Sequence, residues 1–142
     1  ERAATGVQII LDEKKGIIQF ELNVTNPTMK VDELHLTNII RNLLDNAIKY
    51  CDKTPAITIS SSDTNKGITI SVRDNGIGIN PQQKKQVFDK FYRIPTGNVH
   101  NVKGFGLGLY YVKSLVLAHH GTVAVESDSN GSKFTIFLPY LK

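Results

Sequence analysis

The chain has 142 residues, 40% of them hydrophobic and 21% charged, with a net charge of +4, which suits one ordinary globular domain able to fold unaided. Its lysines and arginines are spread along the sequence without a dense basic stripe, so no nucleic-acid partner is expected. The single cysteine, Cys51, excludes an internal disulfide and fits a reducing compartment, and no apolar run approaches the roughly 20 residues that span a bilayer.

The first 16 residues carry a helical pattern. Apolar side chains recur at helical spacing over residues 1–15, and two lysines precede Gly16, a suitable residue to end a helix. Because Gly6 weakens this helix, a strand over residues 7–11 is the alternative.

The next two elements are a strand and a long helix. Residues 17–24 alternate Ile18, Phe20, Leu22 and Val24 with polar positions, which predicts a half-buried strand. Apolar residues at helical spacing then predict a helix from about residue 33 to residue 51, which Asp32 can cap.

A hairpin and a short helix follow. Two alternating runs, 56–61 and 67–73, flank a polar turn and predict a hairpin. Asn80 and Pro81 are typical first residues of a helix, which is expected to turn the apolar side chains of residues 82–92 inward.

The last third of the chain begins with a segment that lacks a periodic pattern. Residues 94–104 contain several breakers and are expected to form a long loop. A helix from Gly106 to His120 and a closing hairpin of 122–126 with 133–138 follow. About five strands, mostly in hairpins, with helices together on one side predict an α+β sandwich of two layers.

The long helix carries polar side chains that can do chemistry. Asn42 and Asn46 are four residues apart and share one helical face, with Lys49 one turn beyond Asn46. Amide oxygens can bind a metal ion, amide nitrogens can bind oxyanions, and the lysine adds a cation. A polar helix face exposed to solvent explains these three side chains equally well.

A glycine turn follows the second strand of the first predicted hairpin. In the segment Asp74-Asn75-Gly76-Ile77-Gly78-Ile79, the two glycines let the backbone approach a flat ligand, and Asp74 can accept a hydrogen bond from an exocyclic amine. A plain Asn-Gly turn is the alternative interpretation.

A second glycine cluster, Gly104-Phe105-Gly106-Leu107-Gly108-Leu109, opens the helix after the long loop. Unpaired backbone N–H groups and the helix dipole favour phosphate at such a helix start. The cluster is not the dinucleotide fingerprint, because position 109 is leucine, and it lacks the Lys-Ser/Thr ending of a P-loop.

Taken in order, four segments resemble the N, G1, F and G2 boxes of bacterial sensor histidine kinases. They are 42–50, 74–78, 87–93 and 104–109, and the likeness covers roughly residues 17–140. The resemblance implies the catalytic and ATP-binding domain of such a kinase. It also implies a Bergerat-type two-layer sandwich, as in gyrase and certain chaperone ATPases, with about five strands in a mixed sheet and helices on one face.

The resemblance further implies a role for each matching residue. Asn46 would be the Mg²⁺ ligand, Asn42 and Lys49 would complete the catalytic set, and Asp74 would accept from the adenine amino group. The implied nucleotide contacts are Asn42, Asn46, Lys49, Tyr50, Asp74, Gly76, Ile77, Gly78, Ile79, Phe91, Tyr92, Arg93, Lys103, Gly104, Phe105, Gly106, Leu107, Gly108 and Leu109. Residues 94–105 would form the ATP lid, in which Phe105 stands where many members have a small residue such as threonine.

Position 42 separates phosphotransfer from hydrolysis. The hydrolytic relatives carry a glutamate one helical turn before the metal-binding asparagine, where it serves as general base for water. This chain has Asn42 there, and an amide cannot take up that proton. The site is therefore expected to hold Mg-ATP and hydrolyse it poorly.

The resemblance also implies parts that this sequence lacks. A sensor kinase phosphorylates a histidine, followed by an acid and soon by a proline, on a separate upstream helical hairpin. None of His35, His100, His119 and His120 has that context, so the fragment alone should bind ATP and transfer little. Residues 1–16 are expected to be a helical junction to the upstream domain, and residues 17–142 the ATP-binding domain.

The implied setting is two-component signalling. The upstream domain would pass the phosphoryl group to a response regulator, and the parent protein would be a homodimer anchored in the inner membrane, with this domain in the cytoplasm. A free-standing serine kinase of the anti-sigma type, with the same boxes, is the nearest alternative. A non-catalytic interaction module is the other.

Overall fold

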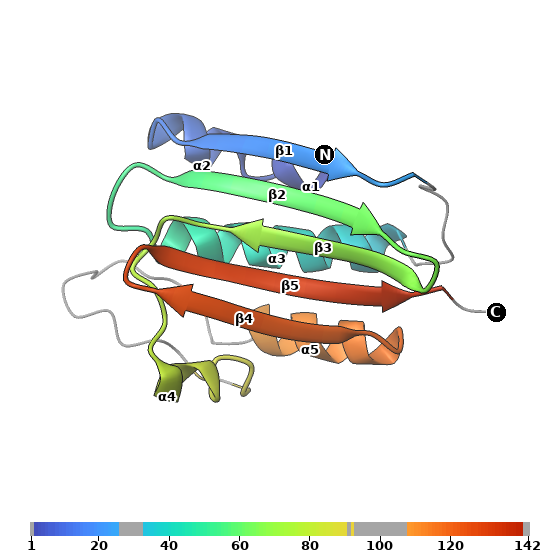
Figure 1. Ribbon diagram of the computed structural model, residues 1–142. Helices are drawn as coiled ribbons and strands as arrows, with labels where there is room; N and C mark the ends of the chain where they lie inside the picture. The colour runs from blue at the N-terminus through green and yellow to red at the C-terminus, as the bar shows by residue number, and fades with distance from the viewer. Residues whose placement is uncertain (1, 26–32, 91, 93–107, 141–142) are drawn as a thin grey trace.

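The computed structural model describes residues 2–25, 33–90, 92 and 108–140. Five strands form one sheet in the order β1-β2-β3-β5-β4 (Figure 1). The strands are β1 (Ile17–Asn23), β2 (Ala56–Asp63), β3 (Gly67–Arg73), β4 (Thr122–Asp128) and β5 (Gly131–Pro139). β1 pairs with β2 in parallel and every other pair is antiparallel, so the sheet is mixed, as expected.

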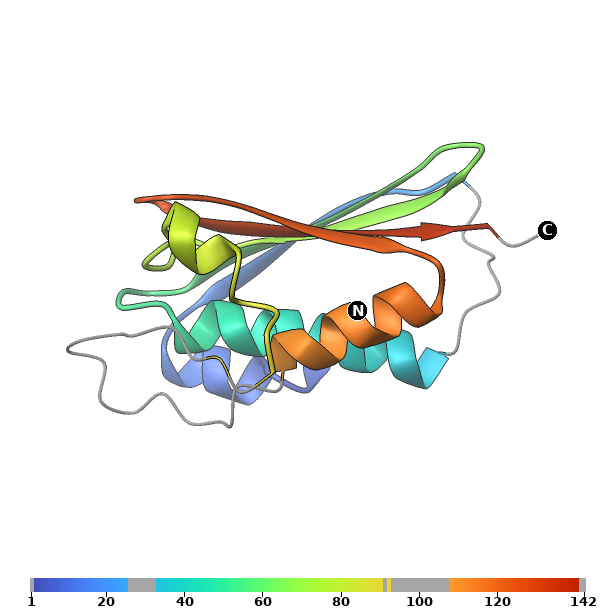
Figure 2. The same ribbon diagram turned by 90° about the horizontal axis from the view of Figure 1, so that it is seen from below.

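The helices make the second layer. The described helices are α1 (Arg2–Thr5), α2 (Gln8–Glu13), α3 (Glu33–Lys49), α4 (Pro81–Lys84) and α5 (Gly108–Ala118). Figure 2 shows α1, α2, α3 and α5 together on one face of the sheet, which confirms the two-layer sandwich. In the described part of the chain, no helix combines the length and apolar character needed to cross a bilayer.

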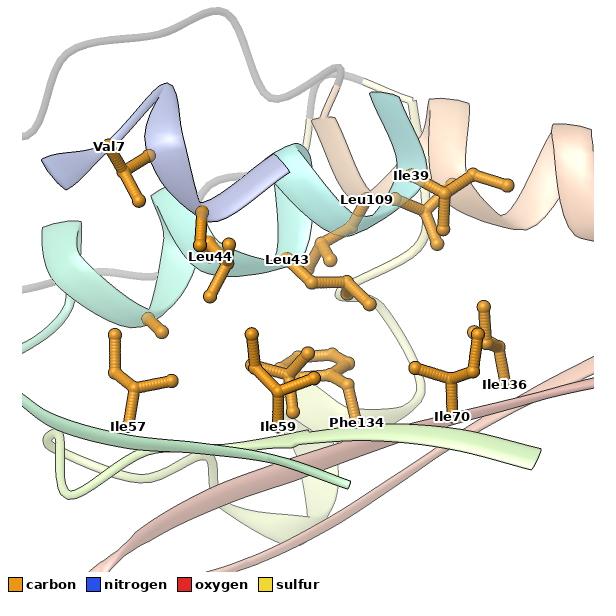
Figure 3. Packing of buried hydrophobic residues seen from close by; sticks show 14 of the residues in the cluster. Val7, Ile39, Leu43, Leu44, Ile57, Ile59, Ile70, Leu109, Phe134 and Ile136 are labelled. Atoms are coloured by element: carbon orange, nitrogen blue, oxygen red, sulfur yellow. The ribbon is translucent and has the colours of Figure 1, made fainter. Parts of the chain in front are cut away.

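The core lies between the two layers. The apolar stripe of α3, with Ile39, Leu43 and Leu44 almost fully buried, faces side chains from β2, β3 and β5 (Figure 3). The sheet contributes Ile57, Ile59, Ile68, Ile70, Val72, Phe134, Ile136 and Leu138 to this core. β1 contributes less, because it is an edge strand, and Phe20 and Leu22 stay 40% and 52% exposed. The sequence pattern therefore found the strand but overestimated its burial.

The N-terminal stretch is helical but not continuous. α1 ends at Thr5 and α2 begins at Gln8, so the single helix expected over residues 1–15 is broken where Gly6 stands, and the alternative strand over residues 7–11 is wrong. Val7 and Leu11 are nonetheless 3% and 0% exposed and belong to the common core. Packing on the domain thus fixes a stretch whose own helix propensity is weak.

Two residues past the ends of helices α2 and α5 stand non-glycine residues in the left-handed region, Lys15 with φ 56° and His120 with φ 62°. The N–H groups of Gly16 and Gly121 bond back to carbonyl oxygens five residues earlier at 2.8 and 2.9 Å, as in a Schellman motif. The expected cap residue Gly16 is thus one position past the left-handed residue. Glycine stands there because a Cβ would lie 2.9 Å from the Pro55 carbonyl oxygen.

We expect His120→Gly to stabilise the domain, because the left-handed conformation disfavours a residue that carries a Cβ and His120 is exposed. The free energy of unfolding, measured with urea, should rise by about 0.5–1 kcal/mol. Ser129→Gly, in an exposed turn without positive φ, is the matched control and should give no gain. An unchanged or lower value for His120→Gly would contradict this account.

The segment after β3 differs from its expected helix. Asn80 caps α4 through a capping box with Gln83, as expected, but α4 ends at Lys84 and turns continue to residue 90. Val87 is 3% exposed, and Phe88 makes an edge-on contact with Phe134 at 6.0 Å between ring centroids. Val87 and Phe88 point inward as predicted, although the backbone is mostly turns, and Phe91 lies outside the described residues.

Candidate functional site

A narrow cavity of about 20 Å³ lies at one end of the sandwich, at the left of Figure 1, where α3 and β3 end and β4 turns into β5. It is lined by Asn46, Tyr50, Asp74, Ile77, Gly78, Ile79, Leu109, Ser132 and Phe134. An open hollow of about 450 Å³ shares residues 77–79 with it and extends toward α4. Two layers and both glycine clusters therefore contribute to one site.

Asp74 is the acidic group in this cavity. Its Oδ1 accepts backbone N–H groups of Gly76 at 2.9 Å and Ser132 at 3.1 Å, while Oδ2 has no hydrogen-bond partner among the described residues. Burial raises the pKa of the Asp74 carboxyl, and the two N–H bonds partly oppose that rise. One oxygen thus fixes the side chain, and the other stays available as an acceptor for a ligand.

The loop after β3 is fixed against the end of α3. The N–H of Ile77 donates to the Tyr50 carbonyl oxygen at 3.0 Å, which satisfies a group left unpaired where the helix ends. Asn75 points the other way, accepting from the Ala56 N–H at 2.9 Å and donating to the Thr54 carbonyl at 3.0 Å. Asn75 is therefore a structural residue, while its neighbours line the cavity.

Two glycines hold the same loop against the β4–β5 turn. Gly78 has φ +80°, and a Cβ there would run into the backbone carbonyl of Asp128. Gly131 has φ +139°, and its Cβ would run into the carbonyl of Asp74. Each segment approaches the other so closely that only glycine fits at the contact.

The amide side chains of Asn42 and Asn46, here called the amide row of α3, face the start of α5. A Cβ on Gly108 would lie 3.2 Å from Asn42 Oδ1 and 3.8 Å from Asn46 Nδ2, so the first residue of α5 touches this row. Asn42 also donates to the Asn38 carbonyl at 2.9 Å. The positive end of the α5 dipole therefore lies beside two amide side chains, an arrangement that suits an anionic group carrying a cation.

The structure brings together most of the described residues that the resemblance implied. Asn46, Tyr50, Asp74, Ile77, Gly78, Ile79 and Leu109 line the cavity. Gly76, Asn42 and Gly108 lie directly behind or beside it. Lys49 does not line it, and its ammonium pairs with Asp45 at 3.0 Å along the same helix.

Other implied residues are only partly placed. Tyr92 is half-buried against the core and is not part of the cavity lining. The following lie outside the described residues: Phe91, Arg93, Lys103, Gly104, Phe105, Gly106, Leu107, the helix cap Asp32 and the whole expected lid, residues 94–105.

Three residues of the site had not been assigned a role. Ser132 and Phe134 line the cavity from β5, and Ser127 on β4 bonds to Ser132. The alternation of β5 puts Ser132 and Phe134 on one face, which the sequence alone could have indicated. The pairing that brings them to Asp74 could not be read from it.

Comparison with known proteins adds an independent result. Residues 31–142 match the family described as "Histidine kinase-, DNA gyrase B-, and HSP90-like ATPase". The chain is 48% identical over 135 residues to the sensor protein RprX of Bacteroides fragilis, covering 93% of this chain and 26% of that protein. It is 38% identical over 131 residues to the sensor histidine kinase CusS of Escherichia coli K12, covering 91% of this chain and 27% of CusS.

The fold agrees with these sequence matches. The mycobacterial sensor histidine kinase MprB superimposes with a TM-score of 0.79 at 29% identity, covering 98% of this chain and 90% of the MprB chain. The catalytic domain of the histidine kinase ThkA, at 23% identity and a TM-score of 0.80, has the same fold, covering 98% of this chain and 90% of the ThkA chain. The chain spans about a quarter of the length of the curated relatives RprX and CusS.

Proposed function

The chain belongs to the histidine kinase-, DNA gyrase B- and HSP90-like ATPase family, and on that premise we propose that it binds Mg-ATP as the catalytic domain of a sensor histidine kinase. In this proposal the adenine enters the cavity beside Asp74, and the triphosphate extends along the amide row toward the start of α5. The γ-phosphoryl group would pass to a histidine on another part of the full-length protein. Positioning and electrostatics are the protein's main contributions to such a transfer.

One observation carries the proposal: Asn46 and Asp74, from different layers and 28 positions apart in sequence, line the same cavity. The carboxylate supplies an acceptor for an exocyclic amine, and the amide supplies an oxygen for a cation. The cavity walls between them are largely apolar, with Ile77, Ile79, Leu109 and Phe134 in the lining. An apolar lining with an acceptor at one side has the chemistry that suits a flat aminopurine. A cavity of about 20 Å³ has room for about one water molecule, so in this proposal its walls move apart to admit the ring.

The residues present fit a magnesium ion. No group of three or more His, Cys, Asp or Glu side chains in the described ranges could hold a metal ion. Mg²⁺ commonly takes few protein ligands and relies on phosphates and water, so one amide oxygen of Asn46, beside Asn42, is a sufficient protein share. When bound, the ion would neutralise phosphate charge.

Asn42 supports transfer over hydrolysis. Its amide donates to the Asn38 carbonyl and carries no basic atom that could take a proton from water. Lys49 would have to leave Asp45 to reach a phosphate, which costs little because an exposed i,i+4 pair is worth only about 0.3–0.5 kcal/mol. We therefore propose Asn42, Asn46 and Lys49 as the catalytic set, of which Asn46 holds the ion.

The rest of the parent protein is part of the proposal. We propose an upstream domain with the phosphoacceptor histidine, a response regulator as its partner, a homodimeric parent and a membrane anchor that leaves this domain in the cytoplasm. The sensor and histidine kinase names of the relatives favour a histidine over a serine acceptor. The boundary between a junction, 1–16, and the catalytic domain, 17–142, stays a prediction, with the junction packed on the core.

The proposed function is tested by titrating the chain with ATP, with and without Mg²⁺, in a calorimeter. We expect Asn46→Ala to lose Mg-dependent binding, because it removes the amide beside the cavity. Asn38→Ala, two turns earlier on α3 and outside the cavity lining, is the matched control and should bind as the wild type does. Micromolar Mg-ATP affinity retained by Asn46→Ala would overturn the assignment of the ion to this residue, and a wild-type chain that binds no ATP would overturn the function.

A further inference from the structure

The hydroxyl of Ser127 stands at the centre of a hydrogen-bond cluster behind the cavity. Ser127 is on β4, directly opposite Ser132 on β5, and both side chains lie on the helix-facing side of the sheet. Its Oγ lies 2.6 Å from the N of Ile79, 2.9 Å from the carbonyl oxygen of Gly131 and 2.9 Å from Ser132 Oγ. These three contacts join the loop after β3 to the β4–β5 turn.

Only one assignment of donors forms all three contacts as hydrogen bonds at once. A serine hydroxyl has one proton to donate and two lone pairs that accept. The Ile79 N–H can only donate, and the Gly131 carbonyl can only accept, so the Ser127 proton goes to Gly131. The remaining lone pair of Ser127 then accepts from Ser132, whose proton points away from the cavity.

Ser132 consequently faces the cavity with lone pairs alone. It is 7% exposed and lines the cavity together with Asp74, whose Oδ2 is also a free acceptor among the described residues. A reversed Ser132 hydroxyl would lose its hydrogen bond to Ser127, the one that its side chain makes among the described residues. The polar side of the cavity beside Asp74 therefore accepts hydrogen bonds and offers no serine donor.

We infer that Ser127 is a positioning residue that sets base specificity: by holding the Ser132 proton, it makes the site select a 6-amino purine over a 6-keto purine. The inference rests on the proposed function, because it requires the adenine ring in this cavity. A 6-amino group can donate to Asp74 and Ser132, directly or through water. A 6-keto oxygen would face their lone pairs and find no donor from Ser132.

The test compares the dissociation constants of ATP and ITP, which carry an amino and a keto group at position 6. The wild type should prefer ATP, and Ser127→Ala should reduce that preference about three- to tenfold, the range of one neutral hydrogen bond, because Ser132 can then turn its proton into the cavity. Ser127→Thr keeps the hydroxyl and should restore the preference. Thermal unfolding of each variant reports whether the fold is retained.

A double-mutant cycle separates this role from a structural one. Ser132→Ala should lower the same preference, and adding Ser127→Ala to it should change the ratio no further, because Ser127 acts through Ser132. A purely structural role would weaken ATP and ITP equally and leave the ratio unchanged, which would overturn the inference. The inference would also be overturned if Ser127→Ala reduced the preference for ATP over ITP equally with and without Ser132→Ala. A Ser127→Thr protein whose preference for ATP is no stronger than that of Ser127→Ala would overturn it as well. Absence of ATP binding by the wild type would instead reject the proposed function.

Discussion

Asp74→Asn is expected to weaken ATP binding by about 10- to 150-fold, the range for losing a hydrogen bond to a charged group. The two backbone N–H groups that now bind Oδ1 would bind the amide oxygen of asparagine in its place. The amide nitrogen of asparagine then takes the position of Oδ2. Its N–H groups would face the N–H groups of the adenine amino group, so no hydrogen bond could form between them. Isothermal titration with ATP measures the loss, and circular dichroism confirms that the fold is retained.

The same variant is expected to be more stable than the wild type without nucleotide at neutral pH. Burial raises the pKa of Asp74 in the folded state, so ionisation there disfavours the native state relative to the unfolded one. Wild-type stability should therefore fall as pH rises from the ordinary pKa of aspartate through the raised value, and Asp74→Asn should lack this fall. Urea unfolding across that pH range measures the difference.

Asp89→Asn is the matched control for both effects. Asp89 is exposed and outside the cavity lining, so removing its charge should change neither ATP affinity nor the pH dependence of unfolding appreciably. If Asp74→Asn bound ATP with an affinity within twofold of the wild type, the assignment of Asp74 to recognition of the adenine ring would be contradicted. A stability difference that does not grow with pH would contradict the buried-carboxylate account.

The sequence predicted the local placement of polar side chains and turns where adjacent residues determine structure. The spacing of Asn42 and Asn46 puts both amides on one face of α3, because helical periodicity allows nothing else. The Asn80 cap and the hairpin turns were predictable for the same reason, since each depends on a few adjacent residues. The convergence of Asn46 and Asp74 required the resemblance to a family, because periodicity does not report which strand lies beside which helix.

What the sequence missed depends on contacts between distant segments. The contact of Ser127 with Ser132 and the position of Ser132 beside Asp74 follow from the register of β4 with β5 and of β5 with β3, which no local pattern specifies. The partner of Lys49 was not predicted either: its position in the N box suggested a phosphate contact, which stays a prediction, while in the structure its ammonium pairs with Asp45. The exposure of Phe20 and Leu22 likewise follows from strand order and not from alternation.

The second large effect is expected from Gly78→Ala. An alanine at φ +80° is unfavourable by about 1–2 kcal/mol, and its Cβ would also run into the Asp128 carbonyl. The loop cannot move aside without breaking the Ile79 N–H bond to Ser127 Oγ. We therefore expect the free energy of unfolding to fall by more than about 2 kcal/mol and ATP binding to weaken at least tenfold.

Gly6→Ala provides the same chemical change without the same constraint. Gly6 has no positive φ, and its Cβ would meet only the guanidinium end of the exposed Arg41 side chain, which can move. Its effect on unfolding should stay within about 0.5 kcal/mol, with ATP affinity unchanged. If Gly78→Ala unfolded at the same urea concentration as the wild type and bound ATP equally well, the loop would not need its close approach to Asp128. The cavity would then have to be formed by other contacts, because Ile77 and Ile79 flank this glycine in the cavity wall.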